Sequence, residues 1–162
     1  MRTKKIIIFA FIVLLWLVAD QIAKAQALYE LGSGIVITVI PQVLSLQLAF
    51  NTGGAFSVFE GSSYLLAAIC VLVCIAILIY IFKTLRTISY LGIVSLALVF
   101  AGGLGNLIDR ICHGYVLDFL KVDLIDFPIF NIADIGVTIG VVLFIISLML
   151  SADKATNQTS EA

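Results

Sequence analysis

The sequence has few charged residues for its length. Only 12% of its 162 residues are Asp, Glu, Lys or Arg, it contains one histidine and two prolines, and 62% of it is hydrophobic, with a mean hydropathy of +1.22. Water-soluble domains are about 45–50% apolar and about 25% charged. A composition this poor in charge excludes an ordinary soluble domain and predicts a membrane protein.

The three cysteines and the single histidine do not form a pattern typical of a disulfide framework or a metal site. Cys70 and Cys74 lie one helical turn apart in an apolar run, where small apolar packing is the default role. Cys112 is next to His113, but neighbours in sequence seldom face each other productively, and no third group at a useful spacing supports a nucleophilic pair. One histidine offers no metal cluster. We therefore expect neither a metal nor another cofactor.

Long uncharged runs predict four membrane helices. Three runs approach or exceed the roughly 20 residues that cross a bilayer as helix. The first run is shorter, and it becomes long enough only if the helix includes Asp20 and Lys24, which are four residues apart and can form an ion pair. In a single membrane domain covering 1–162, we expect helices at about 5–28, 61–82, 87–109 and 131–152 and a disordered tail at about 153–162.

Basic residues predict how these helices are oriented, because short cytoplasmic loops collect Lys and Arg. Six of them precede the first helix, link the second to the third, or follow the fourth: Arg2, Lys4, Lys5, Lys83, Arg86 and Lys154. The other two loops are acidic and contain only Arg110 and Lys121 as basic residues. Both termini are therefore expected on the cytoplasmic side.

A cleaved signal peptide is an alternative interpretation of the N-terminal run. Residues 25–27, Ala-Gln-Ala, match a cleavage site. However, the apolar region of a signal peptide is normally free of charge, whereas this one would contain Asp20 and Lys24. We therefore expect the first helix to remain in the protein.

The first external loop has the pattern of a small sheet. A β-branched run at 35–40 ends at Pro41, and residues 44–50 then alternate between large apolar side chains and polar or small ones. We expect two short strands in an extracytoplasmic β region at about 32–58, between the first two helices. Gly53 and Gly54 follow and predict a turn or a close approach. The second external loop, at about 110–130, has no predicted strand.

The third helix carries a polar stripe. Gly102, Asn106 and Arg110 are spaced by four residues and lie on one face. Close helix packing with Asn106 as an interhelical hydrogen-bonding group explains the stripe up to that residue. Arg110 needs another explanation. It either pairs with the adjacent Asp109 or presents its donors to a carboxylate, a phosphate or peptide carbonyls.

Two carboxylates flanked by apolar residues lie close in sequence to the fourth helix. Asp118 stands in YVLDF and Asp134 in FNIAD, with Asn131 three residues earlier as a possible N-cap. The helix dipole favours an acidic residue in the first turn, so Asp134 alone has a structural explanation. If the two carboxylates meet, repulsion and desolvation make them share a proton, and they could then act as the acid and base of an aspartic peptidase. Their spacing of sixteen residues does not show that they meet.

Five polar motifs follow one another along the chain: DQIAK, NTGGAFS, GGLGNLIDR, YVLDF and FNIAD. Together they resemble the lipoprotein signal peptidase family, from the first helix through the fourth. The resemblance implies an aspartic endopeptidase of the bacterial plasma membrane, with its active site at the extracytoplasmic face. Such an enzyme removes the signal peptide of prolipoproteins on the amino side of a diacylglyceryl-modified cysteine.

The resemblance also implies which residues form the site. Asp118 and Asp134 are the catalytic pair. Residues in the same motifs are expected to bind substrate or support the pair: Asp20, Lys24, Asn51, Gly53, Gly102, Asn106, Asp109, Arg110, Asn131 and Ala133. The expected partners are diacylglyceryl-modified prolipoproteins and membrane lipid, with no nucleic acid, and the expected state is a monomer.

Functions of other classes remain open at this point. Asp, Arg and Asn within membrane spans also line permeation paths, so the alternative is a small ion- or proton-coupled transporter. Against it, the ionisable residues gather at the external ends of the predicted helices. An assembly subunit that uses its small-residue helix face would leave Asp118 and Asp134 without a task.

Overall fold

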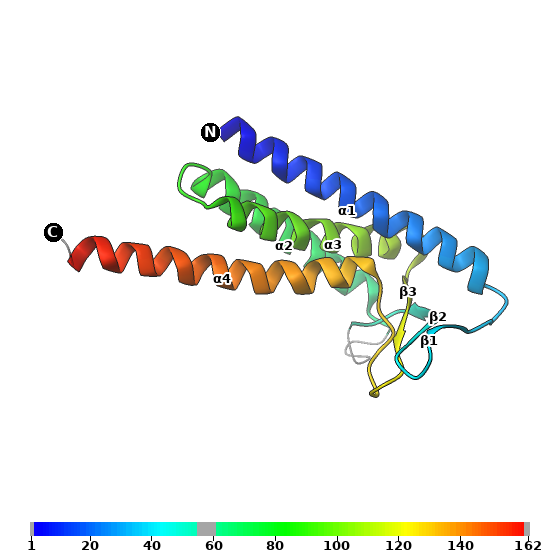
Figure 1. Cartoon of the computed structure of the whole chain (residues 1–162). Coiled ribbons are helices and arrows are strands. Elements are labelled where there is room, and N and C mark those ends of the chain that lie inside the picture. The colour runs from blue at the N-terminus through cyan, green and yellow to red at the C-terminus, as the bar shows by residue number, and fades with distance from the viewer. Residues whose placement is uncertain (1, 55–60, 161–162) are drawn as a thin grey trace.

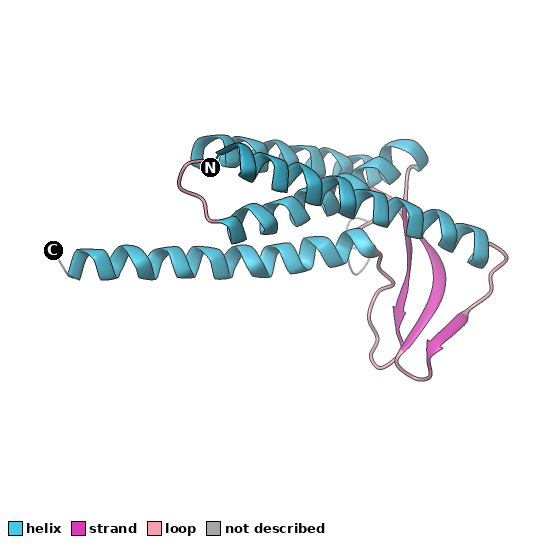
Figure 2. Cartoon of the chain, turned by 45° about the horizontal axis from the view of Figure 1, so that its top comes forward, coloured by secondary structure: helices cyan, strands magenta, loops and turns pink. Residues whose placement is uncertain are grey.

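Four long helices run side by side, with a small sheet at one end (Figures 1 and 2). The structure, a computed structural model, describes residues 2–54 and 61–160, with residues 154–160 described by their backbone alone. The helices are α1 (Arg2–Leu31), α2 (Ser63–Thr84), α3 (Tyr90–His113) and α4 (Ile132–Ser160). All four are long and apolar enough to cross a membrane, as predicted. The first and last described residues both lie at the end away from the sheet.

The helices extend beyond most of their predicted ends. α1 continues to Leu31, and α3 continues to His113, where Gly114 at φ 81° forms a left-handed cap and donates its N–H to the carbonyl of Arg110. α4 continues to Ser160, so the prediction of a disordered tail is wrong for residues 153–160. That stretch is polar but contains no glycine or proline to end the helix. Residues 161–162 lie outside the described chain.

α3 is the central helix and packs against the other three. Small residues permit these contacts, as the predicted packing face requires. A Cβ added at Gly102 would clash with the carbonyl oxygen of Ala133 in α4, and one added at Gly105 would lie 2.7 Å from the Asp20 carboxylate of α1. The stripe therefore brings α1 and α4 close to α3 at the end of the bundle that carries the sheet.

The sheet has three antiparallel strands in the order β1 (Ile37–Ile40), β2 (Leu44–Asn51) and β3 (Val116–Val122). The two strands predicted in the first loop are present. The third corrects our prediction, because β3 lies between α3 and α4 in a segment expected to be a loop. Its first four residues are all buried, so they lack the alternation that reveals a half-exposed strand. Residues 55–58 of the predicted β region lie outside the described chain.

A bulge in β2 sets its register against β3 and thereby places Asn51 relative to Asp118. Leu46 pairs with Leu120 and Ala49 with Asp118, so β2 has one extra residue between these pairs. Beyond the bulge, Asn51 pairs with Val116. Because side chains alternate along a strand, Asn51 projects from the same face of the sheet as Asp118.

Candidate active site

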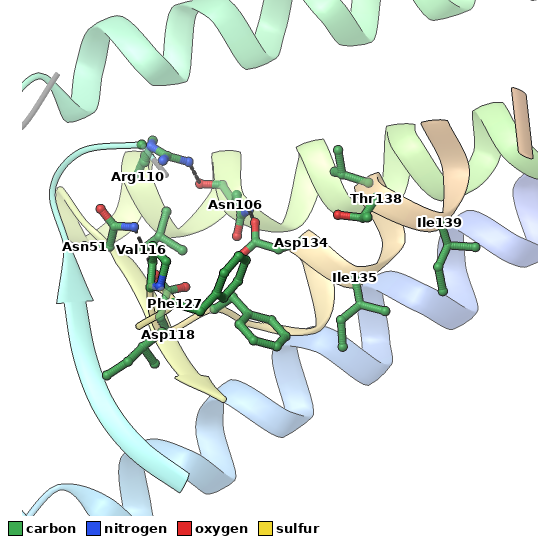
Figure 3. Close-up of a pocket in the computed structure, with 15 residues that line it drawn as sticks. Asn51, Asn106, Arg110, Val116, Asp118, Phe127, Asp134, Ile135, Thr138 and Ile139 are labelled. Atoms are coloured by element: carbon green, nitrogen blue, oxygen red, sulfur yellow. Dashed lines mark hydrogen bonds between the residues drawn. The ribbon is translucent and has the colours of Figure 1, made fainter. Parts of the chain in front are cut away.

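Asp118 and Asp134 line the same cavity, although they come from different elements (Figure 3). Asp118 is in β3, and Asp134 is in the first turn of α4. The cavity has a volume of about 470 Å³, and its polar lining also includes Asn51, Asn106 and Arg110. The structure thus brings together the two carboxylates whose proximity could not be derived from their spacing.

Asn131 contacts both acids. Its side-chain Nδ2 donates to Oδ1 of Asp118 at 2.6 Å, and its backbone N–H donates to Oδ2 of Asp134 at 3.2 Å. In return, its Oδ1 accepts the backbone N–H of Asp134 at 2.9 Å. Asn131 is therefore the N-cap of α4, as predicted, and also links the two carboxylates.

Two further asparagines complete the contacts of the acids. Nδ2 of Asn106 donates to Oδ1 of Asp134 at 2.8 Å, and Nδ2 of Asn51 donates to Oδ2 of Asp118 at 3.0 Å. Each oxygen of the pair thus accepts a hydrogen bond from a neutral amide. Neither Asp118 nor Asp134 forms an ion pair with any described residue.

The environment of Asp118 favours its protonated form. Its side chain is only 2% exposed, and burial raises its pKa from the ordinary value of 3.8 to about 7. The hydrogen bond from Asn51 opposes this rise in pKa, whereas the negative charge of Asp134 adds to it. Asp118 can therefore hold or release a proton near neutral pH, as an acid or base in catalysis must.

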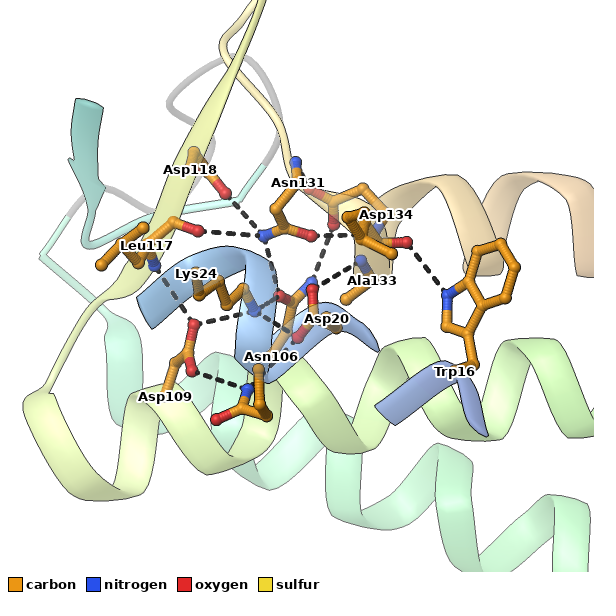
Figure 4. A network of polar contacts seen from close by, with 12 residues as sticks. Trp16, Asp20, Lys24, Asn106, Asp109, Leu117, Asp118, Asn131, Ala133 and Asp134 are labelled. Carbon is orange, nitrogen blue, oxygen red and sulfur yellow. Dashed lines mark hydrogen bonds and ion pairs between the residues drawn. The ribbon is translucent and has the colours of Figure 1, made fainter. Parts of the chain in front are cut away.

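Lys24 lies at the centre of a buried network beneath the acids (Figure 4). Its Nζ pairs with Oδ2 of Asp20 at 2.8 Å and with Oδ2 of Asp109 at 2.9 Å, and it donates to Oδ1 of Asn106 at 3.1 Å. The pair with Asp20 was predicted. Because Lys24 holds the oxygen of the Asn106 amide, the nitrogen of that amide faces Asp134.

The two carboxylates around Lys24 also hold the backbone next to each catalytic candidate. Oδ1 of Asp20 accepts the N–H of Ala133 at 2.8 Å, one residue before Asp134. Oδ2 of Asp109 accepts the N–H of Leu117 at 3.2 Å, one residue before Asp118. A pair between Asp109 and Arg110 is not formed, because adjacent residues of a helix do not face each other.

Arg110 is 6% exposed, and its guanidinium binds backbone carbonyls instead of a carboxylate. It donates to the carbonyl of Gly53 at 3.0 Å and to that of Asn106 at 3.3 Å. Gly53 in turn donates its N–H to Oδ1 of Asn51, which forms a tight turn after β2. Within residues 2–54 and 61–160, Nε of Arg110 has no hydrogen-bond partner. Residues 55–57 of the NTGGAFS motif lie outside the described chain.

Two supporting residues were missed in the sequence. The indole N–H of Trp16 donates to the carbonyl of Ile132 at 3.0 Å, and Nε2 of Gln21 donates to both Asp20 and Asp109 at 3.2 Å. Trp16 is the only tryptophan and lies within an apolar run, which was a usable signal because its N–H needs a partner. Nothing in the sequence pointed to a role for Gln21 except its position next to Asp20.

Cys112 and His113, considered as a possible nucleophilic pair, line neither this cavity nor the one beside it. Cys112 is exposed, and the ring of His113 stacks on Tyr115 with centroids 5.7 Å apart. In the part of the chain that the structure describes, no three His, Cys, Asp or Glu residues are grouped to hold a metal ion. The cavity itself is lined by carboxylates, side-chain amides and the guanidinium of Arg110.

Comparison with known proteins identifies the family. The model of the signal peptidase II family matches residues 12–150, a segment that contains all five motifs. The chain belongs to the signal peptidase II family. It is 38% identical over 146 residues to the lipoprotein signal peptidase of Streptococcus pneumoniae, covering 90% of this chain and 95% of that protein. To the lipoprotein signal peptidase of Streptococcus thermophilus it is 41% identical over 129 residues, covering 80% and 84%.

Solved structures agree with this membership. One described as a bacterial membrane enzyme is 34% identical, superposes with a TM-score of 0.74, and covers 94% of this chain and 91% of that one. A second with the same description is 36% identical with a TM-score of 0.69, covering 90% and 92%. The family and the four apolar helices make the chain a multi-pass membrane peptidase, which decides against the transporter alternative.

Proposed function

We propose that this chain removes signal peptides from prolipoproteins by hydrolysis at an aspartate dyad. It cuts on the amino side of a diacylglyceryl-modified cysteine. The observation that supports this dyad is that Asp118 and Asp134 line one cavity. Each carboxylate there accepts a hydrogen bond from a neutral side-chain amide. The names of the matched relatives support the substrate class.

In the reaction, a water molecule lies between Asp118 and Asp134, which together hold one proton. One carboxylate accepts a proton from the water as its oxygen attacks the scissile carbonyl carbon, while the protonated partner donates to the carbonyl oxygen. The tetrahedral intermediate then breaks its C–N bond, and a proton moves to the amine of the departing cysteine residue. Burial raises the pKa of Asp118 to about 7, so this carboxyl can hold the shared proton at the start.

The supporting residues divide into two roles. We had expected Asn51, Asn106, Arg110 and Asn131 to hold the substrate backbone as well as to orient the acids. The side-chain amides of the three asparagines are engaged with the acids and with their own surroundings, which supports an orienting role. Arg110 lines the cavity and already donates to backbone carbonyls, so it is the candidate for binding the substrate backbone.

The site lies at the extracytoplasmic face, and both termini are cytoplasmic. The basic residues near both termini and in the link between α2 and α3 support this orientation, because these three segments gather at the end opposite the sheet. The acyl chains of the substrate then remain in the outer leaflet while its peptide enters the cavity. A monomer suffices, since one chain supplies both acids.

The decisive test is cleavage of a diacylglyceryl-modified prolipoprotein by purified Asp118→Asn and Asp134→Asn variants. Each substitution keeps the side-chain shape but removes the shared proton, so the rate should fall at least about 100-fold. Asp123→Asn is the matched control, because Asp123 lines neither cavity and instead contacts Ser45 and Lys121. Normal cleavage by either dyad variant would show that the catalytic assignment is wrong.

A further inference from the structure

A second cavity adjoins the first on the side of the sheet. Its volume is about 530 Å³, and residues 49–54 form one wall while residues 126–129 form another. The two cavities share Asn51, Gly54, Asp118 and residues 127–129 in their linings. A peptide bound at the dyad can therefore extend in two directions from Asp118.

The two directions differ in chemistry. The first cavity continues along α4, past the apolar side chains of Ile135, Val137 and Ile139. All three lie in a candidate membrane span. The residues that line the second cavity belong to the sheet and its loops, and none lies in a candidate span. An apolar signal peptide matches the first direction, and the remainder of a lipoprotein, which leaves the membrane, matches the second.

Asp126 gives the second cavity its charge. Among the described residues of this lining, Asp118 and Asp126 are the only ionisable ones, and none is basic. Asp126 is exposed and forms no hydrogen bond or ion pair with any residue in the described ranges. Nearby Asp123 differs, because it accepts a hydrogen bond from Oγ of Ser45 at 2.5 Å, lies 4.0 Å from Nζ of Lys121 and lines neither cavity.

We propose that the second cavity binds the residues that follow the lipidated cysteine, and that Asp126 makes it select basic over acidic side chains there. The inference rests on the proposed peptidase function and adds a specificity-determining residue to it. The unpartnered carboxylate attracts a Lys or Arg side chain of the substrate and repels Glu or Asp. Because the cavity is open to solvent, salt screens both effects.

The test uses diacylglyceryl-modified prolipoprotein peptides that differ only in carrying Lys, Gln or Glu at the second to fourth residues of the mature segment. The measured quantity is the ratio of kcat/KM for the Lys and Glu substrates. For the unmodified protein we expect a ratio of about five, the size that a partly solvated charge pair supports. In Asp126→Asn the ratio should approach one, and in Asp126→Lys it should invert. Asp123→Asn is the matched control and should keep the original ratio.

Each outcome bears on one proposal or the other. A ratio that is already one in the unmodified protein, or that Asp126→Lys leaves unchanged, would overturn the role of Asp126. An equal change in Asp123→Asn would also overturn it, because the effect would then come from general surface charge. Loss of the preference as salt is raised is expected, and a salt-independent preference would contradict an electrostatic origin. If Asp118→Asn cleaved all three substrates at the normal rate, the dyad itself would be wrong, which is a separate result.

Discussion

Two buried lysines of α1 have the same exposure but different partners. Lys5 and Lys24 are each 4% exposed and lie near opposite ends of the helix. Lys5 donates to three backbone carbonyls, those of Leu85 at 3.1 Å, Arg86 at 3.5 Å and Ile88 at 2.7 Å. Lys24 instead binds two carboxylates and an amide oxygen. Both satisfy the hydrogen-bonding capacity of a buried ammonium, but only Lys24 is paired with opposite charge among the described residues.

The difference shows how the same residue type can serve either packing or function. The carbonyls around Lys5 belong to the link between α2 and α3, so Lys5 fastens two segments at the end of the bundle away from the sheet. Each carboxylate around Lys24 also accepts a second hydrogen bond. Asp20 accepts it at Oδ1, and Asp109 accepts it at Oδ2, the oxygen that also pairs with Lys24. They bind the backbone before Asp118 and before Asp134, so a change at Lys24 is transmitted to both acids.

Removal of the charge at Lys24 should have the largest effect. Lys24→Met leaves Asp20 and Asp109 buried without their cation, and we expect the free energy of unfolding to fall by about 3–5 kcal/mol. Prolipoprotein cleavage should be lost as well, because Asn106 and the backbone beside both acids lose their support. Thermal unfolding in detergent and the cleavage assay measure the two effects. A variant as stable and active as the unmodified protein would contradict the role given to Lys24.

The corresponding change at Lys5 should affect stability alone. Lys5→Met leaves the carbonyls of the α2–α3 link without their donor, which should cost about 1–3 kcal/mol of unfolding free energy. The cleavage rate per folded molecule should stay within about twofold, since the three residues that accept hydrogen bonds from Lys5 are not among the described lining residues of either cavity. A loss of cleavage as large as that of Lys24→Met would remove the distinction between the two ends of α1.

The remaining expected effect is a dependence of stability on pH that arises from Asp118 at the sheet end. The folded state raises the pKa of Asp118 from 3.8 to about 7, so it binds this proton more tightly than the unfolded chain does. The resulting stabilisation is complete below the ordinary pKa and is lost as the pH rises through about 7. Relative to Asp118→Asn, the Tm of the unmodified protein should therefore fall by at least about 2 °C between about pH 5 and about pH 8.

Lys5→Met provides the control for this pH effect. Lys5→Met should keep the pH dependence, because it leaves Asp118 unchanged. Catalysis should follow the same ionisation, since the dyad needs one proton, and the cleavage rate should fall as the pH rises above about 7. A Tm difference between the unmodified protein and Asp118→Asn that stayed constant over this range would show that Asp118 is not the titrating group.

Local patterns in the sequence predicted the parts of the structure that depend on neighbours along the chain. The four helices followed from hydropathy, the Asp20–Lys24 pair from a spacing of four, and the N-cap at Asn131 from its distance to Asp134. Each of these contacts lies within one helix or at its end. The family motifs then named Asp118 and Asp134 as partners, which spacing alone could not do.

Contacts between distant segments were not predictable in this way. The pairing of Lys24 with Asp109 requires a particular rotation of α1 against α3, and nothing in either segment alone specifies it. The strand β3 was missed because its first residues are buried on both faces. The pairing of β3 with the part of β2 that contains Asn51 depends on the bulge in β2, and no periodic pattern in the sequence reveals such an irregularity.

The origin of the two acids in different elements has a consequence for the order of biosynthesis. β3 precedes α4 in the chain, so Asp118 leaves the ribosome before Asp134 does. A nascent chain with three inserted helices contains one acid and lacks the N-cap residue that links it to the other. With the proposed dyad, peptide hydrolysis therefore begins only when the last helix packs against α3, and an unfinished molecule is inactive as a peptidase.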